Sequence, residues 1–116
     1  MGRIENAIIT GTMLGREDHG ILTWIIYMES GCCAWGVGGY ALDSYDRETK
    51  KRVFSAKSME SISEVLRVVG VDKWEDLPGK YVRYEDNGIG SSVTKIGNII
   101  SDTWFDIAGF FKGDSE

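Results

Sequence analysis

The stretch that decides the fold is Ile4–Glu29, IENAIITGTML-GREDHG-ILTWIIYME. Two apolar segments rich in β-branched residues, Ile4–Leu14 and Ile21–Glu29, flank a polar hexapeptide that begins and ends with glycine. Strand-forming residues on both sides of such a turn predict an antiparallel hairpin. Apolar side chains fall on both faces of Ile21–Glu29, so we expect this strand to be central or covered by a partner chain.

The residues after this hairpin are first glycine-rich and then charged. Trp35–Leu42 (WGVGGYAL) has strand character, and its glycines favour a bulged or strongly bent strand. Asp43–Lys51 (DSYDRETKK) is expected to be a charged, mobile connection, and Arg52–Ser55 a short extended segment.

From Ser58 onward the apolar residues recur with the period of a helix. Ser58 or Ser61 is the expected N-cap, and Gly70 is expected to end the helix. The apolar stripe consists of Met59, Ile62, Val65, Leu66 and Val69.

The last third of the chain predicts a second hairpin. A connector with one helical turn around Trp74, capped by Asp72, leads to expected strands at Tyr81–Tyr84 and Val93–Ile100. The segment that follows, WFDIAGFF from Trp104, must pack on the core or on another subunit, because a free apolar tail would aggregate.

Together these elements predict one α+β domain over residues 1–116. We expect a small antiparallel β-sheet or half-barrel of two hairpins, with one main amphipathic helix and a short C-terminal helix or tail.

Composition narrows the classes of function. The 116 residues carry a net charge of −5, which argues against a partner that is polymeric nucleic acid but leaves room for a pocket that binds one small anion. No apolar run is long enough to cross a bilayer, and Glu5 and Asn6 interrupt the segment where a signal peptide would be apolar. We therefore expect a cytoplasmic protein without a membrane partner, and the adjacent Cys32 and Cys33 suit a reducing compartment.

A catalytic or metal site can be drawn at the first turn, but the pattern is weak. Glu17, Asp18 and His19 are adjacent there, and Asp43 and Asp46 could come near. Neighbouring turn residues point in different directions, and a single His is a poor ligand set. The simpler interpretation is a solvated turn, with no catalytic residues, no metal and no cofactor.

The start of the helix is the better candidate for binding an anion. Ser55–Ser58 could present backbone N–H groups, two hydroxyls and the Lys57 ammonium to a phosphate. Glycines in a strand allow close approach of a ligand, and aromatic rings can stack on a base. More commonly, such residues are a solvated lysine, a bent strand and core aromatics. The candidate ligand-binding residues are Trp35, Gly38, Gly39, Tyr40, Arg52, Lys57, Ser58, Tyr84 and Trp104.

Four segments resemble a family of small phage and prophage proteins. They read LGREDHGILT from Leu14, GVGGYALD from Gly36, VGVDKWEDLPGKYVR from Val69 and IGNIISDTWF from Ile96. The chain resembles the first-described Thoeris anti-defence family from about Ile4 to Phe105. The resemblance implies a β-rich sponge that encloses glycocyclic ADP-ribose, or a cyclic oligonucleotide, in the host cytoplasm and releases it intact. It also implies a homo-oligomer, a dimer or a dimer-based hexamer, with pockets near subunit interfaces.

The resemblance transfers no binding residue, because the arginine expected against the phosphates is absent after Trp104, where the chain offers only Lys112. Two other classes stay open. An acidic protein could block a host defence protein by direct binding, and a ring-opening hydrolase could use Glu17, Asp18 and His19.

Overall fold

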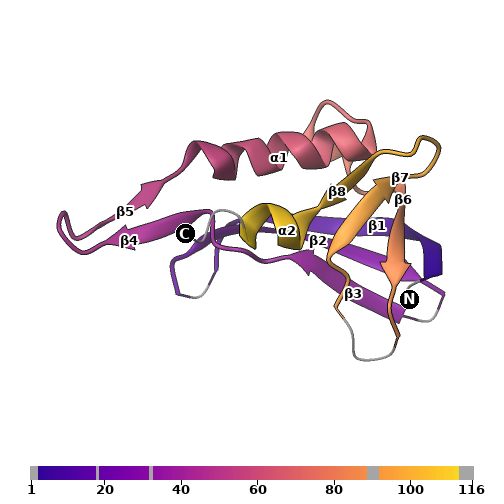
Figure 1. Ribbon diagram of the computed structural model, residues 1–116, viewed down its shortest axis with the longest axis horizontal. Helices are drawn as coiled ribbons and strands as arrows, with labels where there is room; N and C mark the ends of the chain where they lie inside the picture. The colour runs from indigo at the N-terminus through magenta and orange to yellow at the C-terminus, as the bar shows by residue number, and fades with distance from the viewer. Residues whose placement is uncertain (1–2, 18, 32, 89–91, 113–116) are drawn as a thin grey trace.

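The computed structural model describes residues 3–17, 19–31, 33–88 and 92–112. Within these residues the chain builds a mixed α+β fold on a six-stranded antiparallel sheet, in the order β3-β2-β1-β6-β7-β8 (Figure 1). The described part of the sheet does not close into a barrel. Its strands are β1 (Arg3–Arg16), β2 (Leu22–Ser30), β3 (Cys33–Gly38), β6 (Tyr81–Asp86), β7 (Lys95–Asn98) and β8 (Trp104–Asp106). The predicted fold class and both predicted hairpins are confirmed.

Strand β1 joins the two halves of the sheet. Its residues from Ile8 to Arg16 pair with β2, and its residues from Arg3 to Ile8 pair with β6. A register shift between Ile9 and Gly11 lies within the part that pairs with β2, close to the point where pairing with β6 ends. Such a bulge bends a strand and increases its twist, so one strand can serve both hairpins.

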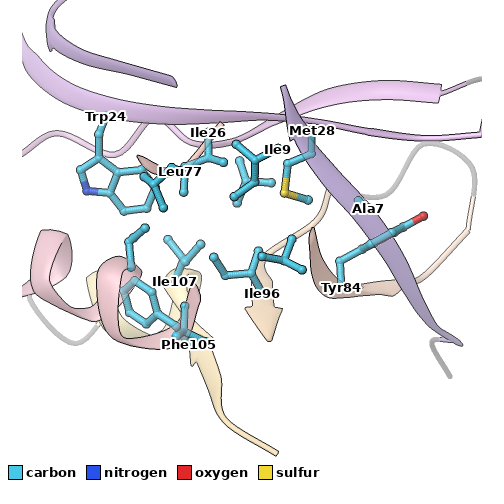
Figure 2. Close-up of a cluster of buried hydrophobic side chains, with 14 of the residues drawn as sticks. Ala7, Ile9, Trp24, Ile26, Met28, Leu77, Tyr84, Ile96, Phe105 and Ile107 are labelled. Atoms are coloured by element: carbon cyan, nitrogen blue, oxygen red, sulfur yellow. The ribbon is translucent and has the colours of Figure 1, made fainter. Parts of the chain in front are cut away.

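The helices cover one face of the sheet, and the core lies between the two layers. Figure 1 shows α1 (Ala56–Val69) and α2 (Ile107–Lys112) on the same side, and Figure 2 shows the buried side chains beneath them. Side chains alternate between the two faces of a strand, so the buried residues of each strand point toward the helices. The fully buried core residues include Ile9, Trp24, Ile26, Met28, Val65, Val68, Leu77, Val82, Ile96 and Ile107.

Residues 43–54 form a small hairpin, the arm, which projects from the rest of the fold, called the body below. This arm consists of β4 (Asp43–Asp46) and β5 (Lys51–Phe54), which among the described strands pair only with each other, and Figure 1 shows it extending away from the six-stranded sheet. The charged connection predicted over Asp43–Lys51 contains strand β4 and the turn of this hairpin. Asp46 organises the turn by accepting hydrogen bonds from the Glu48 amide and the Thr49 hydroxyl.

The N-cap of helix α1 lies three residues before the first predicted cap. The N-cap is Ser55, whose hydroxyl accepts the Ser58 amide at 3.2 Å, so the prediction of Ser58 or Ser61 was wrong. Ser61 is buried instead, where its oxygen accepts the Trp24 indole N–H at 3.1 Å. Gly70 ends the helix with a positive φ of 89°, as predicted.

Several other element boundaries in the structure differ from the predicted ones, and at β3 and β7 a turn ends the strand early. Strand β3 ends at Gly38, before the predicted Leu42, since Gly38 and Gly39 both have positive φ. Strand β7 ends at Asn98, whose side chain accepts the amides of Ile100 and Ser101. The helical turn at Trp74 is confirmed as the 3-10 helix η1 (Trp74–Asp76), but its N-cap is Lys73, without a side-chain cap.

The aromatic tail packs on its own chain. It forms β8 and then α2, and it buries Phe105 and Ile107. The predicted short C-terminal helix is therefore confirmed, and both of these side chains lie in the core.

Candidate functional site

A pocket of about 370 Å³ opens where the arm joins the body. Its volume falls within the range of roughly 300–1,000 Å³ that is typical of small-molecule sites. The walls come from the segment after β3, from both strands of the arm, from the start of α1 and from α2. The lining residues are Tyr40, Ala41, Leu42, Asp43, Ser44, Val53, Phe54, Ser55, Ser58 and Phe111.

An aromatic pair forms one wall of the pocket. The rings of Tyr40 and Phe111 stack with centroids 4.8 Å apart and planes within 12° of parallel. The core holds this pair in place, because Phe111 also contacts the buried ring of Trp24, at 6.5 Å between centroids. A hydrogen bond of 2.6 Å from the Thr23 hydroxyl to the Tyr40 carbonyl oxygen fixes the backbone. The site therefore has a planar surface on a rigid support.

The beginning of helix α1 forms another part of the lining of the pocket. Ser55 and Ser58 both line it, and their hydroxyls lie 3.0 Å apart. The first amides of a helix lack intrahelical acceptors and carry a partial positive charge. This end of the pocket is therefore polar and suited to a negatively charged group.

A buried ion pair lies at the base of the arm, beside the pocket. The Asp43 side chain is completely buried, and its Oδ2 lies 2.8 Å from Arg52 Nε. Its Oδ1 accepts Arg52 Nη2 at 3.0 Å and the Leu22 amide at 3.3 Å. Hydrogen bonds from Arg52 hold the pKa of Asp43 below its usual value, although burial acts in the opposite direction. Asp43 is therefore ionised at neutral pH, and Arg52 neutralises it.

Lys57 stands on the first turn of α1, close to the pocket. Its ammonium lies 4.9 Å from the centre of the Phe110 ring, in a cation–π contact with α2. Phe110 in turn meets Phe111, so the cation is held beside the aromatic wall.

The structure brings several of the predicted ligand-binding residues together here. Tyr40 and Ser58 line the pocket, and Arg52 and Lys57 flank it. Gly39, adjacent to Tyr40, donates its amide to the Trp24 carbonyl oxygen. A Cβ on Gly38 would lie 2.6 Å from the Trp24 ring, so this glycine is required by packing against the core.

Three other predicted residues lie elsewhere. Trp35 and Tyr84 pack together with centroids 4.8 Å apart, and Figure 2 places Tyr84 at the opposite end of the core from Trp24. Trp104 lies across Gly97 with Arg83 and Lys95 near its ring. Its neighbour Phe105 is buried, so alternation places Trp104 on the outer face of the sheet.

The first turn stays separate from the pocket lining. His19 is highly exposed, and its ring nitrogen lies 3.4 Å from Glu17, which also accepts the amides of His19 and Ile21. Burial raises the pKa of Glu17, but these hydrogen bonds outweigh it and leave the pKa below its ordinary value. Asp18 lies outside the described residues. Among the described side chains, no group of three or more His, Cys, Asp or Glu is placed to hold a metal ion.

Sequence reasoning missed the aromatic wall and the arm. Phe111 was expected to pack on the core or on another subunit, and Val53 and Phe54 were expected in a short extended segment, but all three line the pocket. The paired phenylalanines at the end of the tail were the available signal for Phe111. The arm had no such signal, because its charged turn resembles a solvated loop.

The fold and the pocket together define a small α+β protein with an open, partly aromatic cavity beside a helix N-terminus. No family model, curated protein or solved structure matches the chain. None of the described helices is long and apolar enough to cross a membrane.

Proposed function

We propose that the protein binds a cyclic nucleotide signal in the pocket between Tyr40, Phe111 and the start of α1, and sequesters it without cleaving it. The ligand class is glycocyclic ADP-ribose or a cyclic oligonucleotide, as the resemblance to the Thoeris anti-defence family implies. The observation that carries the proposal is the pairing of an aromatic wall with a helix N-terminus in one cavity. A nucleotide needs both, since its base stacks and its phosphates require N–H donors.

The distribution of charge supports an anionic ligand at this place. Residues 45–57 contain five of the 13 basic residues but only two of the 18 acidic ones. The chain as a whole is acidic, so this region is a local exception. A basic region beside a pocket raises the local concentration of an anionic ligand.

Binding without chemistry fits the side chains that line the pocket. Asp43 carries the only carboxylate among the described lining residues. This carboxylate is ion-paired with Arg52 and accepts a hydrogen bond from the Leu22 amide. The other polar side chains of the lining are hydroxyls of Tyr40, Ser44, Ser55 and Ser58. A general base would need a free lone pair at the ligand, which a carboxylate engaged in this way does not offer.

The proposed setting is the cytoplasm of an infected host, with the protein acting as a homo-oligomer, a dimer or a dimer-based hexamer. The exposed apolar side chains of the arm support contact between copies. Tyr45 and Phe54 of the arm, and Met59 on the neighbouring helix α1, are each more than half exposed, and Val53 of the arm is 42% exposed. Exposed apolar side chains in one region of a small protein often mark an interface. Native mass spectrometry of the purified chain tests the oligomer, and a monomer at micromolar concentration refutes it.

The same surface favours a second candidate function, in which the arm blocks a host defence protein directly. The matched test compares the wild type with a Tyr45→Ser/Phe54→Ser variant in pull-downs from host lysate. A partner recovered only by the wild type, and then reconstituted from purified components, supports this function. Equal recovery by both proteins contradicts it.

The test of the primary proposal uses released ligand. The purified protein is incubated with cyclic ADP-ribose isomers and cyclic di- and trinucleotides, freed of unbound ligand and heated, and the supernatant is analysed by mass spectrometry. An intact nucleotide is the expected result. A modified nucleotide contradicts sequestration, and an empty supernatant contradicts nucleotide binding.

Variants then locate the site. Phe111→Ala is expected to weaken binding by roughly 5- to 150-fold, since one base stack contributes about 1–3 kcal/mol. Trp104→Ala removes an aromatic ring on the outer face of the sheet and is expected to leave affinity unchanged. If Trp104→Ala weakens binding and Phe111→Ala does not, the binding site lies at Trp104 instead.

A further inference from the structure

The joint between the arm and the body is built around one buried carboxylate. Asp43 is the first residue of β4, and its side chain is completely buried. Its carboxylate accepts a hydrogen bond from the Leu22 amide of β2 and another from the Arg52 guanidinium of β5. Arg52 also donates to the Asp43 carbonyl oxygen at 3.3 Å. One residue therefore links β2, β4 and β5.

Among the described residues, little else holds the arm against the body. The Leu42 amide donates to the Leu22 carbonyl oxygen at 2.8 Å, directly before β4. The arm itself is an isolated two-stranded sheet with four residues in each strand. Such hairpins are marginally stable on their own, so the position of the arm depends on its joint.

The pocket spans this joint. Ser44, Val53 and Phe54 belong to the arm, whereas Tyr40 and Phe111 belong to the body. A change in the angle of the arm therefore changes the width of the cavity.

We propose that Asp43 is the positioning residue of the pocket, and that Arg52 acts through Asp43 and not by contacting the ligand. The inference rests on the proposed function for its binding readout. Two nitrogens of Arg52, Nε and Nη2, lie 2.8 and 3.0 Å from the Asp43 carboxylate, so these two groups are engaged at the joint. The role assigned to Arg52 differs from the phosphate contact expected from the sequence.

The charges at the joint are consistent with a permanently ionised pair. Arg52 faces Asp43, and Glu17 on the first turn adds a second negative charge that acts on Arg52. Both side chains therefore carry their charges at neutral pH.

The experiment compares Asp43→Asn, Arg52→Gln and the double variant with the wild type and with Lys51→Gln. Lys51→Gln is the control, because it removes a cation of the arm without altering the joint. Two readouts are used: hydrogen–deuterium exchange of residues 44–53 without ligand, and calorimetric titration with cyclic ADP-ribose. Circular dichroism and exchange of β1 and α1 verify that each variant is folded.

Asp43→Asn is expected to increase the rate of exchange in the arm and to weaken binding, each by about tenfold, because it leaves Arg52 without its counter-charge. Arg52→Gln is expected to do the same. The double variant is expected to be no worse than either single variant, since both changes break one interaction.

Three outcomes overturn the proposal. Unchanged exchange of the arm in Asp43→Asn shows that the carboxylate does not hold it. Weaker binding by Arg52→Gln with unchanged exchange shows that Arg52 contacts the ligand directly. Additive losses in the double variant show two independent roles. If the wild type fails to bind cyclic ADP-ribose while the arm exchanges faster in the variants, the joint is supported and the choice of ligand is refuted.

Discussion

Replacing Gly38 by alanine tests why two adjacent glycines follow β3. A Cβ on Gly38 would lie 2.6 Å from the Trp24 ring and 2.7 Å from its carbonyl oxygen, and the residue has a φ of +106°. Overpacking of this kind costs about 1–3 kcal/mol, and a disfavoured backbone conformation costs about 1–2 kcal/mol more. Gly38→Ala is therefore expected to destabilise the protein by about 2–5 kcal/mol.

Gly39→Ala is the matched control. Gly39 also has a positive φ, of +83°, but no described atom lies within 4 Å of the place that a Cβ would take there, so only the backbone cost of about 1–2 kcal/mol remains. Urea unfolding monitored by tryptophan fluorescence measures both variants, and the midpoint of Gly38→Ala should be clearly lower. Equal losses in the two variants would refute the argument that contact with Trp24 dictates the first glycine.

Three further predictions concern the elements around the site. Ser55→Ala removes the N-cap of α1 and should cost about 1 kcal/mol in urea unfolding, whereas Ser63→Ala on the exposed side should cost less than about 0.5 kcal/mol. Trp24→Phe removes the indole hydrogen bond to Ser61 and should cost about 1–2 kcal/mol, and no loss in thermal unfolding would contradict a role for that bond. Because the pKa of Asp43 is lowered by folding, its ionised pair stabilises the protein above the unfolded pKa of about 3.9 and loses this effect as the pH falls through the folded pKa. The stability difference between wild type and Asp43→Asn should therefore be largest at pH 7 and shrink in acid, and a difference independent of pH would contradict the ion pair.

Periodicity predicted the parts of the fold that face the core. The helical spacing of Val65, Leu66 and Val69 predicted the face of α1 that packs on the core, although Met59 of the same stripe is 71% exposed. The apolar residues on both faces of β2 predicted its central place in the sheet, between β3 and β1. The arm was missed because its short strands are stabilised by contacts of Asp43 and Asp46 that no local pattern shows. The cap of α1 was misplaced by three residues because any of several serines could serve.

The sequence predicted several individual residues of the site but not the partner that completes its aromatic wall. Tyr40, Lys57 and Ser58 come together as a polar and aromatic region, but their wall partner Phe111 lies 71 residues beyond Tyr40 in the chain. Long-range partners of this kind depend on topology, which a single sequence does not specify. Trp35 and Tyr84 have the composition of a stacking platform but pack against each other, which leaves them as a part of the core.

The shared strand β1 sets an order of events during folding. Its pairing with β2 closes a loop of a few residues, whereas its pairing with β6 joins Ile8 to Tyr81 across most of the chain. Closing a long loop costs more chain entropy and is slow, so the first hairpin is expected to form early and the β1–β6 ladder late. Substitutions in the half of β1 that pairs with β2 should then slow refolding, whereas substitutions in the half that pairs with β6 should mainly accelerate unfolding. The change of pairing partner at Ile8 thus marks a kinetic boundary within a single strand.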